Sequence, residues 1–100
     1  MLMELTIIPL GGRRSISGDI AELVKTIEGS RLDYRMTAFG TLVDGSWDQF
    51  VALAKCHFAV RNKSERVLTM IRIDDYGERT GEIEGAVNRV EKELGRAVKK

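Results

Sequence analysis

The chain has 100 residues, of which 43% are hydrophobic and 31% are charged. This balance is typical of a globular protein and excludes a disordered or collagen-like chain. The formal net charge is +1, and acidic and basic residues are mixed along the sequence without the basic stripe expected of a nucleic-acid-binding protein. The length suits one domain with a single core, which we expect to span residues 1–100.

The sequence lacks the patterns of membrane insertion and secretion. No apolar run approaches the roughly 20 residues that cross a bilayer. The first residues follow a strand pattern with an early Glu4, instead of a charged segment followed by an apolar core, so we expect no signal peptide. Cys56 is the only cysteine and cannot form an internal disulfide. We therefore expect a cytoplasmic protein with no membrane or nucleic-acid partner.

The first predicted element is a strand over residues 1–9, which ends at the only proline. Apolar side chains occur on both of its faces, so both faces need cover. A loop follows at residues 11–15. Ser17 is then the candidate N-cap of a helix with an apolar stripe at helical spacing, and Gly29 closes that helix.

Alternating residues predict a second strand over residues 32–39 and a short third strand over residues 41–43. Gly40 lies between them and indicates a tight antiparallel connection. We expect glycine at this position because such turns often need a positive φ.

The second half of the chain predicts two helices and one strand. Ser46 and Gln49 have the spacing of a capping box, and the helix that they open ends near Asn62. Alternation predicts a strand over residues 67–74. A last helix is expected from about Gly81, with a narrow seam of apolar residues similar to that of a coiled coil.

The order β-α-β-β-α-β plus a terminal helix predicts an α+β ferredoxin-like sandwich, in which two helices cover one face of a four-stranded antiparallel sheet. The other face is left open. Leu42 is expected on the covered face. The residues expected on the open face are Ile8, Phe39, Val43, Leu68 and Met70, with Glu4, Thr6, Arg35, Thr37, Thr41 and Arg72 among them.

An open face with this many apolar residues predicts assembly, because monomers rarely expose contiguous apolar patches above a few hundred Å². We expect sheet-to-sheet or sheet-edge packing in a symmetric homo-oligomer. The alternative is a monomer in which the terminal helix folds back over this face.

Four segments together resemble the thiamine-binding protein family. They are residues 4–11, Tyr34 with residues 40–48, His57, and residues 66–74. The resemblance covers nearly the whole chain. It implies a ferredoxin-like subunit that assembles into homodimers or a homotetramer. It also implies binding of thiamine or its pyrimidine portion without catalysis. We expect no cofactor.

An aminopyrimidine offers ring-nitrogen acceptors and an amine donor, and it suits a flat slot with apolar walls and a few polar groups. The hydroxyls of Thr6, Thr37 and Thr41 can each donate and accept. Phe39 and Tyr34 can wall the ring. Glu4 can accept from the amine or pair with the thiazolium charge. The resemblance favours Thr6, Tyr34, Gly40 and Thr41. The alternative is that the threonines are ordinary strand residues and Tyr34 belongs to the core.

Gly12, Arg13 and Arg14 precede a helix start and could hold an anion through backbone N–H groups and guanidinium groups. The alternative is an exposed solvated loop. Cys56 and His57 are adjacent on a predicted helix and do not face each other, so they predict neither a metal pair nor a nucleophilic pair. We expect His57 to be a packed or interface residue, and we expect no metal site and no catalytic residue.

Two other functions fit the same fold. A small acyl-phosphate hydrolase would use the arginine loop and an asparagine that positions water, but neither Asn62 nor Asn88 lies on a predicted strand near that loop. A regulatory or assembly subunit would use the open face to bind protein alone.

Overall fold

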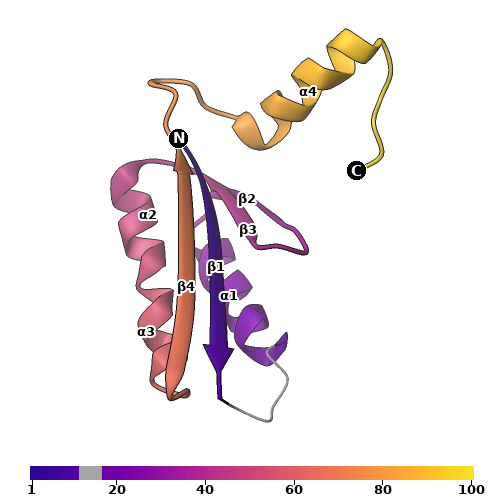
Figure 1. The fold of residues 1–100 in the computed structure, drawn as a ribbon. Coiled ribbons are helices and arrows are strands. Elements are labelled where there is room, and N and C mark those ends of the chain that lie inside the picture. The colour runs from indigo at the N-terminus through magenta and orange to yellow at the C-terminus, as the bar shows by residue number, and fades with distance from the viewer. Residues whose placement is uncertain (12–16) are drawn as a thin grey trace.

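A computed structural model describes residues 1–11 and 17–100 (Figure 1). The elements are β1 (Leu2–Leu10), α1 (Ser17–Gly29), β2 (Asp33–Met36), β3 (Thr41–Asp44), α2 (Trp47–Ala54), α3 (Cys56–Arg61), β4 (Arg66–Asp74) and α4 (Glu82–Leu94). The strands form one antiparallel sheet in the order β2-β3-β1-β4. Both crossovers lie on one side, which confirms the predicted ferredoxin-like α+β arrangement with an extra C-terminal helix. Among the helices of the described residues, none is long and apolar enough to span a membrane.

The core lies between the centre of the sheet and the helices α1, α2 and α3. Met3, Leu5 and Ile7 of β1 are at most 1% exposed, and they pack against side chains that the helices supply. The helical residues of this core are Leu23, Ile27, Phe50, Leu53 and Val60. The first predicted strand therefore supplies the centre of the covered face, as its apolar alternation indicates.

The register of the sheet corrects the predicted faces of β3. Paired residues in a sheet share a face, and Met3 pairs with Val43 while Leu5 pairs with Thr41. Val43 and Thr41 are therefore on the covered face and Leu42 is on the open face, opposite to the prediction. The reason is the hairpin turn: β2 ends at Met36, and the four residues 37–40 form the turn, so Met36 pairs with Thr41.

The helix that was predicted to run from Ser46 to Asn62 is divided. Its start is confirmed, because the Ser46 side chain accepts from the Gln49 N–H while the Gln49 side chain accepts from the Ser46 N–H. At Lys55 the backbone stays in the right-handed helical region, and the Phe58 N–H donates to the Lys55 carbonyl, a tighter i→i+3 bond. A short 3₁₀-type turn therefore joins α2 to α3.

The terminal helix α4 does not cover the open face, so the predicted alternative of a covering helix is wrong. Figure 1 shows α4 projecting from the end of the sheet with only its first turn near the strands. Ile83 in that turn is 4% exposed, whereas Val90 and Leu94 further along are about half exposed. The predicted apolar seam is present, but most of it has no cover within the subunit.

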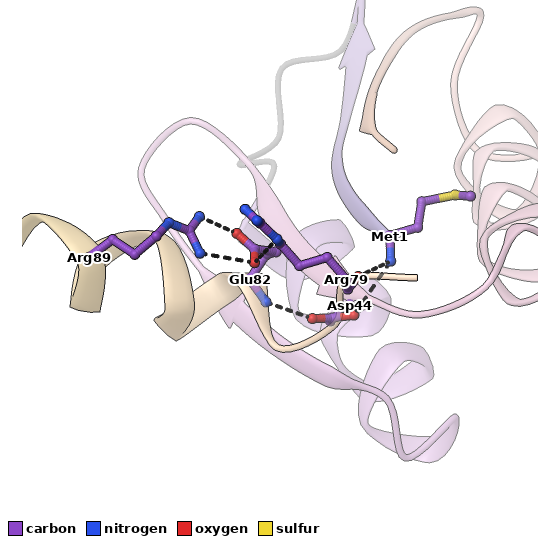
Figure 2. Close-up of polar contacts among 5 residues, drawn as sticks. All are labelled: Met1, Asp44, Arg79, Glu82 and Arg89. Carbon is purple, nitrogen blue, oxygen red and sulfur yellow. Dashed lines mark hydrogen bonds and ion pairs between the residues drawn. The ribbon is translucent and has the colours of Figure 1, made fainter. Parts of the chain in front are cut away.

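A polar cluster fixes the start of α4 (Figure 2). The Asp44 carboxylate at the end of β3 accepts from the Glu82 backbone N–H at 2.9 Å, and it lies 3.9 Å from the N-terminal amine. The Glu82 carboxylate accepts from Arg89 at 2.6 Å and lies 3.8 Å from Arg79. Hydrogen bonding by Arg89 lowers the pKa of Glu82, and Glu82 in turn raises the pKa of Arg89. A side chain from β3 thus caps α4, because no side chain at its own N-cap, Gly81, can do so.

Candidate functional site

A polar row crosses the open face of the sheet from β4 to the β2–β3 turn. It begins with Glu4 and Arg72, which the register places directly opposite each other. The Nη2 and Nε atoms of Arg72 approach Oε1 of Glu4 at 2.7 and 2.9 Å. The Glu4 side chain is only 18% exposed, whereas that of Arg72 is 79% exposed. The pair therefore holds a shielded carboxylate in a defined orientation. Because Arg72 is exposed to solvent, the ion pair contributes little to the stability of the fold.

The next member of the row is Thr6, which joins β1 to the hairpin. Its hydroxyl donates to the Phe39 carbonyl at 2.8 Å. Gly40 packs against the same point: a Cβ there would overlap the Thr6 hydroxyl and lie 3.0 Å from the Leu5 carbonyl. The expectation of a positive φ at Gly40 is wrong, because Gly40 is not among the residues with positive φ. Close approach of the hairpin to β1 requires the glycine instead.

The turn itself depends on Thr37. Its hydroxyl donates to the Gly40 carbonyl at 2.8 Å and accepts from the N–H groups of Phe39 and Gly40. One donated and two accepted bonds use the whole capacity of a hydroxyl. Thr37 therefore shapes the turn, and the turn presents the Phe39 ring at its tip with 85% of that residue exposed.

The six predicted ligand residues divide between the two faces of the sheet. Thr6, Thr37, Phe39 and Gly40 gather at the hairpin end of the open-face row. Tyr34 and Thr41 lie on the covered face, because their register partners, Val43 and Leu5, belong to the core.

The two residues on the covered face, Thr41 and Tyr34, do not lie beside the groups of the open-face row. Thr41 is 3% exposed. Tyr34 packs against the core, and the neighbouring Glu28 carboxylate raises the pKa of its phenol. The predicted anion-binding residues Gly12, Arg13 and Arg14 lie outside the described residues.

The histidine and the cysteine are separated as predicted. His57 Nδ1 lies 2.6 Å from the Thr69 hydroxyl of β4, and its ring packs edge-on against Phe58. This is the packed residue that the sequence predicts. Cys56 lies on another side of α3, at a cavity of about 160 Å³ between α1 and α3, where burial raises the pKa of its thiol.

Comparison with known proteins identifies relatives that share this architecture. Residues 3–91 match the family model described as thiamine-binding protein. The chain belongs to the thiamine-binding protein family. YqgV of Bacillus subtilis, a UPF0045 protein, is 33% identical over 93% of this chain and 96% of its own length.

Solved structures of similar proteins share the fold. The crystal structure of MJ1052 from Methanocaldococcus jannaschii has a TM-score of 0.76 and 27% identity, and the match covers 94% of each chain. TM0486 from Thermotoga maritima, provisionally described as a thiamine biosynthesis/salvage protein, has a TM-score of 0.74. That match covers 89% of this chain and 96% of the other at 17% identity, so it bears on the fold alone.

Sequence reasoning missed two features of this family member. The pairing of Glu4 with Arg72 joins residues 68 positions apart, and only the register of β1 and β4 reveals it. The capping of α4 by Asp44 was missed because Asp44 followed by glycine is typical of a turn. A local sequence pattern cannot indicate a helix cap that is supplied by a side chain from a distant strand.

The open-face row offers a specific chemistry. Glu4 supplies a shielded acceptor with negative charge, and the oxygen of Thr6 has remaining acceptor capacity after its proton goes to Phe39. The exposed Phe39 ring is an aromatic surface at one end. A flat molecule with an amine donor or a positive charge is complementary to these groups.

Proposed function

We propose that this protein binds thiamine or its aminopyrimidine portion on the open face of the sheet, without catalysis, as a homo-oligomer in the cytoplasm. The carboxylate of Glu4, held beside Thr6 and the β2–β3 turn, is the observation that carries this proposal. Membership of the thiamine-binding protein family supports the choice of ligand. The single cysteine fits a compartment in which disulfides do not form.

The proposed contacts follow from the polarity of the ligand. The exocyclic amine of the pyrimidine donates to Glu4, and a ring face stacks on Phe39. In thiamine, the thiazolium charge lies within reach of the same carboxylate. Arg72 orients Glu4 before the ligand arrives, and such preorganisation lowers the entropic cost of binding.

The homo-oligomer is proposed because the open face stays apolar beyond the polar row. Leu68 and Met70 on this face are 45% and 48% exposed, and α4 leaves them uncovered. A flat sheet gives a small ligand only one wall. A second copy against the open face would supply the opposite wall and shield the apolar residues.

Calorimetry and thermal shift with thiamine, its phosphates and the free aminopyrimidine test the proposal. A ligand at 100 times its Kd should raise the stability of the folded state by about 2.7 kcal/mol. Glu4→Gln keeps the shape of the side chain and should weaken binding at least about tenfold, the equivalent of a charge-assisted hydrogen bond.

Glu28→Gln on α1 is the matched control, because Glu28 adjoins Tyr34 on the other side of the sheet. It should leave the affinity unchanged. Equal losses in both variants would move the site away from the open face. Absence of heat and of thermal shift with all of these ligands would refute the proposed function and favour a subunit that binds protein alone.

A further inference from the structure

One line of side chains crosses all four strands on the open face. Glu4 pairs with Arg72 on one side and with Leu42 on the other, and Leu42 pairs with Arg35 of β2. Paired residues share a face of the sheet, so these four side chains form a cross-strand line. Neighbouring strands lie about 4.8 Å apart, so the Cα atoms of Arg35 and Glu4 are about 10 Å apart. From the β2 edge inward, the line presents a cation, an apolar group and a shielded carboxylate.

The two arginines of the cross-strand line differ in how their charges are used. Arg72 donates from Nη2 and Nε to Oε1 of Glu4 at 2.7 and 2.9 Å. Nη2 of Arg35 lies 3.8 Å from Oε1 of Glu84, which is beyond hydrogen-bond distance. The side chains of Arg35 and Glu84 are 41% and 70% exposed, so water weakens their attraction. A guanidinium carries five N–H donors, and Arg35 can therefore exchange Glu84 for a stronger acceptor.

The helix α4 brings Glu84 to the end of the cross-strand line. Asp44 of β3 accepts from the Glu82 N–H, and α4 contacts β3. Glu84 belongs to the same first turn. The rest of α4 projects from the end of the sheet (Figure 1). The helix thus borders the line at Arg35 without covering the open face.

The order of groups on the line matches the polarity of a phosphorylated thiamine. That molecule has an amine donor at one end, two rings in its middle and an anionic phosphate on the arm at its other end. With the amine on Glu4, as in the proposed function, the thiazolium ring lies over Leu42. Its arm is then directed toward β2, where a guanidinium is a suitable partner for phosphate.

We propose that Arg35 binds the phosphate of thiamine monophosphate, and that the protein prefers this ester to thiamine. The inference rests on the proposed function, because both use the contact of the aminopyrimidine with Glu4. On binding, the phosphate replaces Glu84 as the partner of Arg35 and accepts two parallel N–H bonds from its guanidinium. Glu84 then returns to solvent, to which most of its side chain is already exposed.

Neighbouring acids limit the anion to one phosphate. Asp33 of β2 pairs with Asp44 of β3, and both lie on the open face two residues from the cross-strand line, about 7 Å away. Asp44 is engaged with the start of α4. A longer anion at Arg35 comes within reach of Asp33 and Glu84, and like charges repel. We therefore expect thiamine diphosphate to bind no more tightly than the monophosphate.

Calorimetry with two pairs of ligands tests where the phosphate lies. Thiamine monophosphate should bind about fivefold more tightly than thiamine, as expected for an ion pair at a partly exposed site. The second pair is hydroxymethyl aminopyrimidine and its phosphate ester. That phosphate lies beside the pyrimidine ring, so it meets the Glu4 carboxylate before it can reach Arg35. The second pair should therefore show no gain from phosphorylation.

Arg35→Gln tests the residue itself. The ratio of the affinities for thiamine monophosphate and thiamine should fall from about five to about one. Arg66→Gln is the matched control, because it removes the same charge from the same face. Arg66 pairs with Leu10 and lies about 20 Å from Glu4, so the ratio should stay unchanged.

Glu84→Gln tests the exchange of partners. The variant removes the carboxylate that competes with phosphate, so the ratio should rise at least about twofold. Glu93→Gln makes the same change further along α4 and should leave the ratio unchanged. If Glu84 served only to fix α4, its replacement would change the affinities for both ligands by the same factor.

The outcomes distinguish this inference from the proposed function. Thiamine binding that depends on Glu4, with no gain for the monophosphate, overturns the role of Arg35 and leaves the proposed function standing. An unchanged ratio in Arg35→Gln, or an equal gain for the pyrimidine phosphate, places the phosphate elsewhere and also overturns it. Absence of binding by all of these ligands refutes the proposed function and this inference together.

Discussion

Replacement of Gly40 by alanine tests the junction between the hairpin and β1. A Cβ at this position would overlap the Thr6 hydroxyl, lie 3.0 Å from the Leu5 carbonyl and lie 3.3 Å from Cγ of Glu4. The Leu5 carbonyl is part of the central strand and cannot move without disturbing the core residue beside it. The hairpin must therefore shift outward, and the hydrogen bond from Thr6 to the Phe39 carbonyl is lost.

The expected cost combines two effects. Forcing an additional methyl group against packed atoms costs about 1–3 kcal/mol. Loss of one neutral hydrogen bond contributes about 1 kcal/mol more. We expect Gly40→Ala to lower the free energy of unfolding by about 2–3 kcal/mol, because the outward shift relieves part of the overlap.

Urea unfolding at fixed protein concentration measures this change. Gly18→Ala is the control, since no atom lies within 4 Å of a Cβ at that helical position, and it should be neutral or stabilising by up to about 1 kcal/mol. Thr6→Ala removes the overlapping oxygen, so the double variant should cost less than the sum of the single variants. A loss below about 0.5 kcal/mol for Gly40→Ala, or strict additivity with Thr6→Ala, would refute this explanation of the glycine.

Three further predictions follow from the polar cluster and the cysteine. Asp44→Ala removes the cap of α4 and should cost about 1 kcal/mol, with faster amide exchange in the first turn of α4 and unchanged exchange in α1. The pKa of Glu82 is held below its ordinary value of 4.5, so its contribution is present above pH 4.5 and is lost as the pH falls through the depressed pKa. NMR titration of Glu82 should show this low pKa and a return toward the ordinary value in Arg89→Met. Burial raises the pKa of the Cys56 thiol, so alkylation at pH 8 should be slower in the folded protein than in urea, and equal rates would contradict the burial.

Local sequence signals predicted the helices and strands of this fold well. The capping box at Ser46 and Gln49 predicts the start of α2, and the structure contains both of its hydrogen bonds. The apolar alternation of Met3, Leu5 and Ile7 predicts a strand, and these three residues lie at the centre of the core. Such signals succeed because caps and alternation act within a few residues of each other.

The faces of the second hairpin strand could not be predicted in the same way. Alternation in a strand as short as β3 fixes which residues share a face, but the turn decides which face that is. The hydroxyl of Thr37 closes a four-residue turn and reverses the expected faces of Thr41 and Leu42. The turn therefore adds Thr41 to the covered face, where Tyr34 also lies, whereas Thr6 stays on the open face.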